Sequence, residues 1–230
     1  MARLVLLADT HNHRISVPPG DVLIVAGDLT MGGTIGEMSV AATWLHRVCL
    51  EGSFKAALII CGNHDWLGYH DQTTTRLLFE EKGLTYLHDQ ATTIDGINFY
   101  GSPYTPRFMD WAFNVDRGPD LARIWSRIPD DTHVLITHGP PMGILDSCER
   151  MDVSGWECPG RDLTKFIEHV GCADLKARIA KLKSLRLHVF GHVHRPGTDF
   201  GADGTRYINA TIVNESYNPV YSPAVLDLDI

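Results

Sequence analysis

Residues 4–13 read LVLLADTHNH, an apolar run that ends abruptly in polar side chains. Short apolar runs bounded by polar residues are typical of strands that are buried on both faces. Later segments repeat the pattern: VLIVAGD at 22–28, AALIICGNHD at 56–65, HVLITHGPP at 133–141 and LHVFGHVH at 187–194. Each segment predicts a strand followed by a loop that carries Asp, Asn or His.

Helical spacing separates these strands. Apolar residues at i, i+3, i+4 and i+7 predict a helix over residues 38–49. Further helices are expected at 77–82, stopped by Gly83, at 121–128, stopped by Pro129, and at 175–182. Shorter strands are expected at 85–87, 92–94, 97–100, 207–209 and 224–228. The pattern predicts a mixed α/β fold, and residues 1–230 are expected to form one domain.

Composition excludes several classes of protein. With 44% apolar and 21% charged residues, the chain is neither disordered, collagenous nor a coiled coil. A net charge of −8 argues against a nucleic-acid partner held by a basic face. The apolar runs are too short to span a membrane, and the 5 cysteines, Cys158 among them, favour the reducing cytoplasm over a disulfide scaffold. The 12 histidines remain to be explained.

The polar loops carry a set of metal-ligand side chains. Ligands of open α/β sheets collect outside the carboxyl ends of the strands, so these loops are expected to converge. Their inventory is Asp9, His11, Asp28, Asn63, His64, His138, His192 and His194. A mixed nitrogen and oxygen set without thiolates suits Mn, Fe, Zn, Co or Ni and is poor for Ca. The set is too large for one tetrahedral ion and suits two ions that share a bridging carboxylate.

The order Asp-x-His, Gly-Asp, Gly-Asn-His-Asp, His and Gly-His-x-His resembles the signature of the calcineurin-like metallophosphoesterase superfamily. It extends from Asp9 to His194. The segments YGSP at 100–103, THGPP at 137–141 and YINA at 207–210 resemble its MPPED-type branch of metallophosphoesterase-domain-containing proteins. The resemblance implies a four-layer α-β-β-α sandwich, in which helices flank two mixed sheets. Met31 replaces the second Asp of the family's Gly-Asp-x-x-Asp, a position that is not a metal ligand.

The resemblance also implies roles for these residues. One divalent ion, with Mn favoured, would be held by Asp9, His11, Asp28 and His194. A second would be held by Asp28, Asn63, His138 and His192. A hydroxide that bridges the ions would attack phosphorus in line, without a covalent phospho-enzyme. His64 would face the substrate as the catalytic acid, with Asp65 behind it to orient its ring.

The segment 103–118 is expected to be a loop at the substrate cleft. Aromatic rings such as Trp111 could stack on a base while Arg107, Asn114 or Arg117 meets phosphate. His13, close to the first motif, is a further candidate for substrate contact. Core packing under a long loop explains the same aromatic residues equally well. The first interpretation favours a nucleotide-like substrate.

The leading hypothesis is a phosphodiesterase that acts on a small or nucleotide-like diester. A phosphomonoesterase or protein phosphatase is the nearest alternative, but Trp66 stands beside the Gly-Asn-His-Asp motif where an arginine would favour a dianionic phosphate. A catalytically weak nucleotide-binding regulator is the alternative from another class. A nuclease is disfavoured by the charge. The pattern leaves open whether the chain is a monomer or an oligomer.

Overall fold

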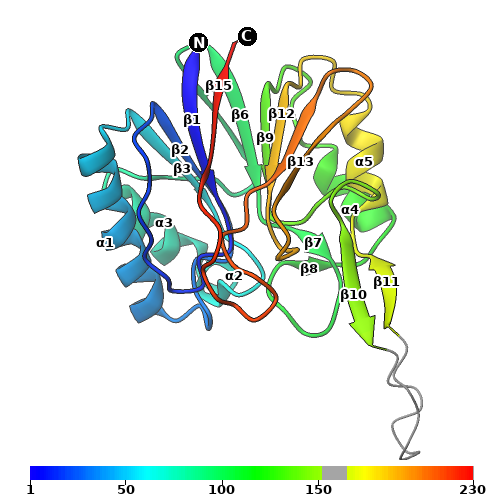
Figure 1. Cartoon of the computed structure of the whole chain (residues 1–230), viewed down its shortest axis with the longest axis horizontal. Coiled ribbons are helices and arrows are strands. Elements are labelled where there is room, and N and C mark those ends of the chain that lie inside the picture. The colour runs from blue at the N-terminus through cyan, green and yellow to red at the C-terminus, as the bar shows by residue number, and fades with distance from the viewer. Residues whose placement is uncertain (152–164, 230) are drawn as a thin grey trace, which may run out of the picture.

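Two β-sheets lie face to face at the centre of the molecule, and helices cover their outer faces (Figure 1). This computed structural model describes residues 1–151 and 165–229. The first sheet has the order β15-β1-β2-β3-β4, and the second has the order β13-β14-β12-β9-β6-β5. Both sheets mix parallel and antiparallel pairs.

The first sheet is built on the apolar runs at the start of the chain. Its strands are β1 (Ala2–Leu7), β2 (Val22–Ala26), β3 (Ala56–Ile60), β4 (Thr85–Tyr86) and β15 (Ala224–Leu228). Strands β1 to β4 pair in parallel, and β15 is antiparallel to β1. The continuous apolar sequences suit strands that are covered on both faces.

The second sheet carries the other predicted strands and one at 197–200 that the sequence pattern did not predict. It contains β5 (Gln90–Ile94), β6 (Ile97–Ser102), β9 (Val134–Thr137), β12 (Leu187–Phe190), β13 (Gly197–Phe200) and β14 (Arg206–Asn209). Strands β6, β9, β12 and β14 are parallel, while β5 and β13 are antiparallel strands at the two edges. The parallel strands of both sheets therefore present their carboxyl ends as loops.

The helices are α1 (Ile35–Gly52), α2 (Trp66–His70), α3 (Gln72–Glu80), α4 (Pro119–Trp125) and α5 (Ala173–Ile179). Helix α1 buries the predicted face that includes Met38 and Leu45, and a capping box of Thr34 and Glu37 begins it. The helix predicted at 77–82 is α3, which begins earlier, at Gln72, and buries Thr75 and Phe79 while Leu77 is exposed. None of the described helices is both long and apolar enough to cross a bilayer.

Three clusters of buried apolar side chains fill the spaces between the layers and pack them together. The middle cluster joins the sheets, with Leu6 and Ile24 on one side and Ile136 and Val189 on the other. A second cluster packs the first sheet against α1 and α3. A third packs the second sheet against α4 and α5. The predicted α-β-β-α sandwich is confirmed.

Two small sheets lie near the carboxyl ends of the strands. Within the predicted loop, β7 (Thr105–Pro106) pairs with β8 (Asn114–Val115). Strands β10 (Ser147–Met151) and β11 (Lys165–His169) pair in antiparallel fashion and extend away from the second sheet (Figure 1). The sequence pattern did not reveal β10 or β11.

Candidate metal centre

The polar loops converge at the carboxyl ends of the strands, as predicted. Asp9 follows β1, Asp28 follows β2 and Asn63 follows β3, so the first sheet supplies one side of the site. His138 follows β9, and His192 and His194 follow β12 in the second sheet. The side chains of Asp9, Asp28 and His138 are almost completely buried. Buried carboxylates and imidazoles at one place need partners, and here they have each other.

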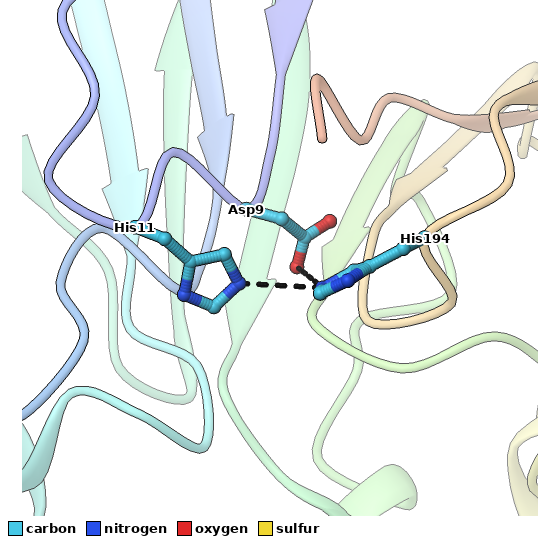
Figure 2. A group of neighbouring side chains, drawn as sticks. All are labelled: Asp9, His11 and His194. Carbon is cyan, nitrogen blue, oxygen red and sulfur yellow. Dashed lines mark hydrogen bonds and ion pairs between the residues drawn. The ribbon is translucent and has the colours of Figure 1, made fainter. Parts of the chain in front are cut away.

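Asp9, His11 and His194 form the first group of potential ligands, and Figure 2 shows their side chains pointing toward one another. The Nε2 atoms of His11 and His194 are 3.3 Å apart, although the residues are 183 positions apart in sequence. Asp9 Oδ1 lies 4.0 Å from His194 Nε2. Since only one proton fits between two such nitrogens, at least one of them presents a lone pair to the centre of the group.

The second group surrounds the side-chain oxygen of Asn63. Asn63 Oδ1 is 2.9 Å from His138 Nε2 and 2.8 Å from His192 Nδ1. Asp28 lies between the groups, because its Oδ2 is 3.3 Å from His138 Nε2 and 3.8 Å from His11 Nε2. A carboxylate in that place can contact cations on both sides.

Backbone carbonyls orient three of the imidazole rings. His11 Nδ1 lies 3.2 Å from Thr30 O, His138 Nδ1 3.0 Å from Ala26 O, and His64 Nδ1 2.8 Å from Met31 O. A carbonyl can only accept, so each Nδ1 carries a hydrogen, and in the neutral form of each ring the free lone pair is on Nε2. This is the tautomer that a metal-binding imidazole requires.

Several candidate ligands have left-handed backbone conformations, which non-glycine residues seldom adopt. The φ angles are 56° at Asp9, 41° at His11, 51° at Asp28 and 68° at His192. Backbone hydrogen bonds hold the first loop in place, from Asp9 N to Gly27 O and from His11 N to Asp28 O. Such strained conformations concentrate at functional sites, because the surrounding structure must enforce them.

The charges of the cluster depend on one another. Burial disfavours the charged form of His138, but the adjacent Asp28 carboxylate outweighs burial and raises the pKa of His138 to about 9. Burial also disfavours the charged form of Asp28, which would raise its pKa. The neighbouring His138 and His11 outweigh burial and hold the pKa of Asp28 well below its ordinary value. Burial, assisted by the charge of His138, lowers the pKa of His192 to about 3. Neutral His192 therefore retains its lone pair.

A cleft of about 490 Å³ opens beside the cluster. Its floor includes Asp28, Asn63, His64, His192 and His194. Its walls include Arg107, Phe108, Met109, Trp111, Arg117, Cys148, Val170 and Tyr217. The volume lies within the range of small-molecule sites, and the walls are partly aromatic and partly charged.

The sequence profile of the calcineurin-like phosphoesterases matches residues 2–196, a range that contains every candidate ligand. The chain belongs to this family. It is therefore a metal-dependent phosphoesterase, a hydrolase of phosphoric esters that acts through a divalent-metal site. The candidate groups fit that role, since carboxylate, amide and imidazole donors converge there and none of the described candidate ligands is a thiolate.

Relatives of this metallophosphoesterase span most of its length. Human metallophosphoesterase domain-containing protein 1 is 34% identical over 250 aligned residues, which cover 98% of this chain and 71% of the human protein. Phosphopantetheinyl hydrolase from Mycobacterium tuberculosis has a similar fold, with a TM-score of 0.58, 15% identity and coverage of 98% and 96% of the two chains. A dimetal phosphatase from Danio rerio matches with a TM-score of 0.53, 11% identity and coverage of 97% and 91%.

Asp65 has a different place in the metallophosphoesterase site from the one predicted. Its carboxylate accepts hydrogen bonds from the backbone of Leu29, Thr30 and Gly62 and from the Thr30 hydroxyl. The partner of the His64 ring is Met31 O instead. Burial and the charge of Asp28 raise the pKa of Asp65 to about 6. Asp65 thus ties the loop after β2 to the loop after β3 and does not orient His64.

The predicted substrate residues divide into two groups. Arg107, Trp111 and Arg117 line the cleft, and the Trp111 ring lies 4.3 Å from the His64 ring between centroids. Asn114 and His13 do not line the cleft. Asn114 Nδ2 donates to Phe108 O within the loop, and His13 Nε2 lies 2.9 Å from Tyr217 O. Both side chains support the backbone that shapes the site.

Sequence reasoning missed the walls that come from β10 and from the segment between β14 and β15. Cys148 and Tyr217 line the cleft, but neither lies in one of the motifs. Their place at the cleft depends on tertiary packing, which no local sequence pattern predicts. The turn-forming sequence NESYNP at 214–219 was the available signal for the second wall.

Proposed function

We propose that residues 1–230 form one domain that binds two divalent transition-metal ions and hydrolyses a small phosphodiester. The first ion would be held by Asp9, His11, Asp28 and His194, and the second by Asp28, Asn63, His138 and His192. The position of Asp28 between the two groups supports its role as the shared ligand. Among ions that accept imidazole, the carboxylate and amide oxygens favour Mn²⁺.

The residues around the proposed metals would divide the chemistry. Bound divalent ions supply Lewis-acid stabilisation of phosphate charge and activation of water near neutral pH. His64 donates a proton from Nε2 to the departing oxygen, because its Nδ1 is already committed to Met31 O. Trp111 lies against the same ring and places the leaving group beside it.

The observation that supports the choice of a diester is that the cleft's arginines already donate hydrogen bonds to other groups of the protein. The Arg107 Nε is 2.5 Å from Asp116 Oδ1. Arg117 donates to Gly171 O at 2.7 Å and to Val170 O at 2.9 Å. Among the described residues that line the cleft, these are the arginines, and no lysine accompanies them. A diester carries one negative charge and a monoester carries two, so this wall suits the diester better.

The aromatic wall supports a nucleotide-like diester. Phe108 packs at 5.0 Å against His192, and Trp111 at 4.3 Å against His64, so flat side chains border the proposed metals. Base stacking on such rings places the phosphate at the floor of the cleft. A cytoplasmic location suits the thiols of Cys49, Cys61 and Cys172, whereas Cys158 lies outside the described residues.

The test compares bis(p-nitrophenyl) phosphate with p-nitrophenyl phosphate on protein that has been stripped of metal and reconstituted with Mn²⁺. We expect turnover that returns with the metal, and a higher kcat/KM for the diester. A preference for the monoester would favour the phosphatase alternative. Absence of turnover with two ions bound would favour a nucleotide-binding regulator.

A further inference from the structure

The ring of Tyr217 packs against two of the proposed ligands at once. Its centroid is 4.8 Å from that of His11 and 4.9 Å from that of His194, with interplanar angles of 72° and 86°. Both are edge-to-face contacts, a favourable geometry for aromatic rings. Tyr217 belongs to the segment between β14 and β15 and is outside every ligand motif. It therefore reaches the site only through tertiary folding.

A tight turn fixes the direction of this ring. Tyr217 has a φ of 60°, a left-handed conformation that is strained for a tyrosine. Its backbone N–H donates to Asn214 O at 2.8 Å. The side-chain oxygen of Asn214 accepts from Ser216 N at 3.0 Å and from Asn218 N at 3.1 Å. These hydrogen bonds hold the turn in a conformation that its sequence would otherwise resist.

The same turn is fastened to both ligand loops. His13, two residues after His11, lies with Nε2 2.9 Å from Tyr217 O and donates to that carbonyl. Arg195, directly after His194, pairs through Nε with Glu215 at 2.7 Å. The turn thus joins the loop after β1 to the loop after β12, and the Tyr217 ring lies where their imidazoles meet.

The two imidazoles differ in what else holds them. His11 Nδ1 donates to Thr30 O, but no residue in 1–151 or 165–229 hydrogen-bonds to His194 Nδ1. A metal-binding imidazole ordinarily has a partner on its second nitrogen, which restricts rotation of the ring. For His194, the described contacts that restrict rotation are ring contacts, with His11 at 5.2 Å and with Tyr217 at 4.9 Å.

We propose that Tyr217 is a positioning residue, whose ring holds the imidazoles of His194 and His11 in the orientation that binds the first metal ion. This inference rests on the proposed ligand role of both histidines. The ring carries the effect through packing, so the hydroxyl is not needed. Loss of the ring leaves His194 free to rotate and weakens one metal site, while the site around Asn63 is unaffected.

The experiment measures release of Mn²⁺ from fully loaded protein into excess chelator. Tyr217→Asn removes the ring but keeps a residue that tolerates the left-handed conformation, so the turn is preserved. Tyr217→Phe keeps the ring and removes the hydroxyl. Tyr221→Ala is the matched control, because Tyr221 is 38% exposed in the same segment and does not line the cleft.

We expect Tyr217→Asn to release one of its two ions about 10-fold or more faster than the wild type. The second ion should leave at the wild-type rate. The release rates of Tyr217→Phe and Tyr221→Ala should lie within about twofold of the wild-type rates. The role of the ring is overturned if Tyr217→Asn releases both ions at the wild-type rate. It is also overturned if Tyr217→Phe releases an ion as fast as Tyr217→Asn does. Uptake of fewer than two ions by the wild type instead overturns the proposed two-metal function.

Discussion

His64 lies where the ligand cluster meets the cleft, and its ring is held by neighbouring rings and by a backbone carbonyl. The ring is edge-on to His11 at 4.7 Å and tilted by 34° to Trp111 at 4.3 Å. Its Nδ1 donates to Met31 O at 2.8 Å. One nitrogen is thereby assigned to the protein and the other is left for the substrate, which is the arrangement that a proton donor needs.

The proton-donor role makes the effect of His64→Ala depend on the leaving group. A poorly leaving alkoxide needs the proton, so its diester should lose roughly 10²–10⁴ in kcat. A p-nitrophenyl diester should lose much less, because p-nitrophenolate leaves without a proton. Steady-state kinetics on both diesters, with His70→Ala as an exposed control, check this. Equal losses on the two substrates would exclude His64 as the acid.

Gly191 illustrates how closely the backbone approaches the ligands. A Cβ at this position would lie 2.4 Å from Asp9 Oδ2 and 2.5 Å from the Cβ of Ala8. Gly191→Ala should therefore displace Asp9, lower the melting temperature and remove at least one metal ion, since overpacking a rigid site costs about 1–3 kcal/mol. Thermal denaturation and metal analysis measure both effects.

Gly36→Ala is the matched control for that substitution. Gly36 lies in α1, where a new Cβ would meet only Thr34 Oγ1, at 4.0 Å. The melting temperature should not fall, because alanine loses less backbone entropy than glycine and the new Cβ has room. A Gly191→Ala protein with both ions and an unchanged melting temperature would contradict the close packing described here.

The sequence motifs predicted which residues belong to the site, but they did not predict the direction in which each side chain points. Asp9, Asp28 and His138 follow apolar strands, so periodicity alone located them. Asp65 adjoins His64 in sequence, yet its side chain turns to the backbone of Thr30. His13 likewise turns to the Tyr217 carbonyl and away from the cleft. Adjacency along the chain does not specify which neighbour a loop side chain will meet.

Strand β12 carries an acid-sensitive group apart from the metal cluster. His188 is fully buried, and its Nε2 lies 2.8 Å from Thr137 Oγ1, which itself donates to Gly139 O. The Nε2 must therefore carry the hydrogen. Among the residues that the structure describes, none is a hydrogen-bond partner of its Nδ1. Burial lowers the pKa of His188 to about 3, because protonation would place an unpaired charge inside the sheet.

This shift predicts a loss of stability in acid. The unfolded chain takes up a proton at His188 near pH 6.5, whereas the folded chain does so only near pH 3. Above pH 6.5 the group does not reduce the free energy of unfolding. At pH 5 it lowers that free energy by about 2 kcal/mol. His188→Gln keeps a donor for Thr137 but does not titrate, so its unfolding free energy should vary less between pH 7 and 5. Denaturant unfolding of both proteins at each pH measures this. An equal change in unfolding free energy for the wild type and for His188→Gln would contradict the prediction.

Elements with a strong apolar pattern were predicted well, and strands with a polar sequence were not. Helix α1 has a wide apolar face and a capping box, so its pattern was unambiguous. Helix α3 is capped by the Asp71 side chain and contains adjacent leucines, but packing against the sheet buries Phe79 and leaves Leu77 exposed. Strands β10 and β11 contain several charged residues and, within the part of the chain that the structure describes, pair with each other alone. Nothing local distinguishes such a hairpin from a polar loop.

At the scale of the whole molecule, the proposed metals join the two sheets. Asp9, Asp28 and Asn63 come from the first sheet, and His138, His192 and His194 come from the second. The middle cluster of apolar side chains already packs the sheets together. Metal binding adds a polar connection at their shared edge and should stabilise the folded chain by mass action. The same two sheets thus pack together in the core and supply the candidate ligands at their shared edge.

The most direct test of the account counts metal ions per chain by native mass spectrometry after reconstitution with Mn²⁺. We predict two ions for the wild type and for the exposed control His70→Ala. Asn63→Ala and His194→Ala should each keep one, because each loses a ligand of a different ion. Asp28→Ala should hold none, since it removes the shared carboxylate. Two ions in Asp28→Ala, or one ion in the wild type, would contradict the account.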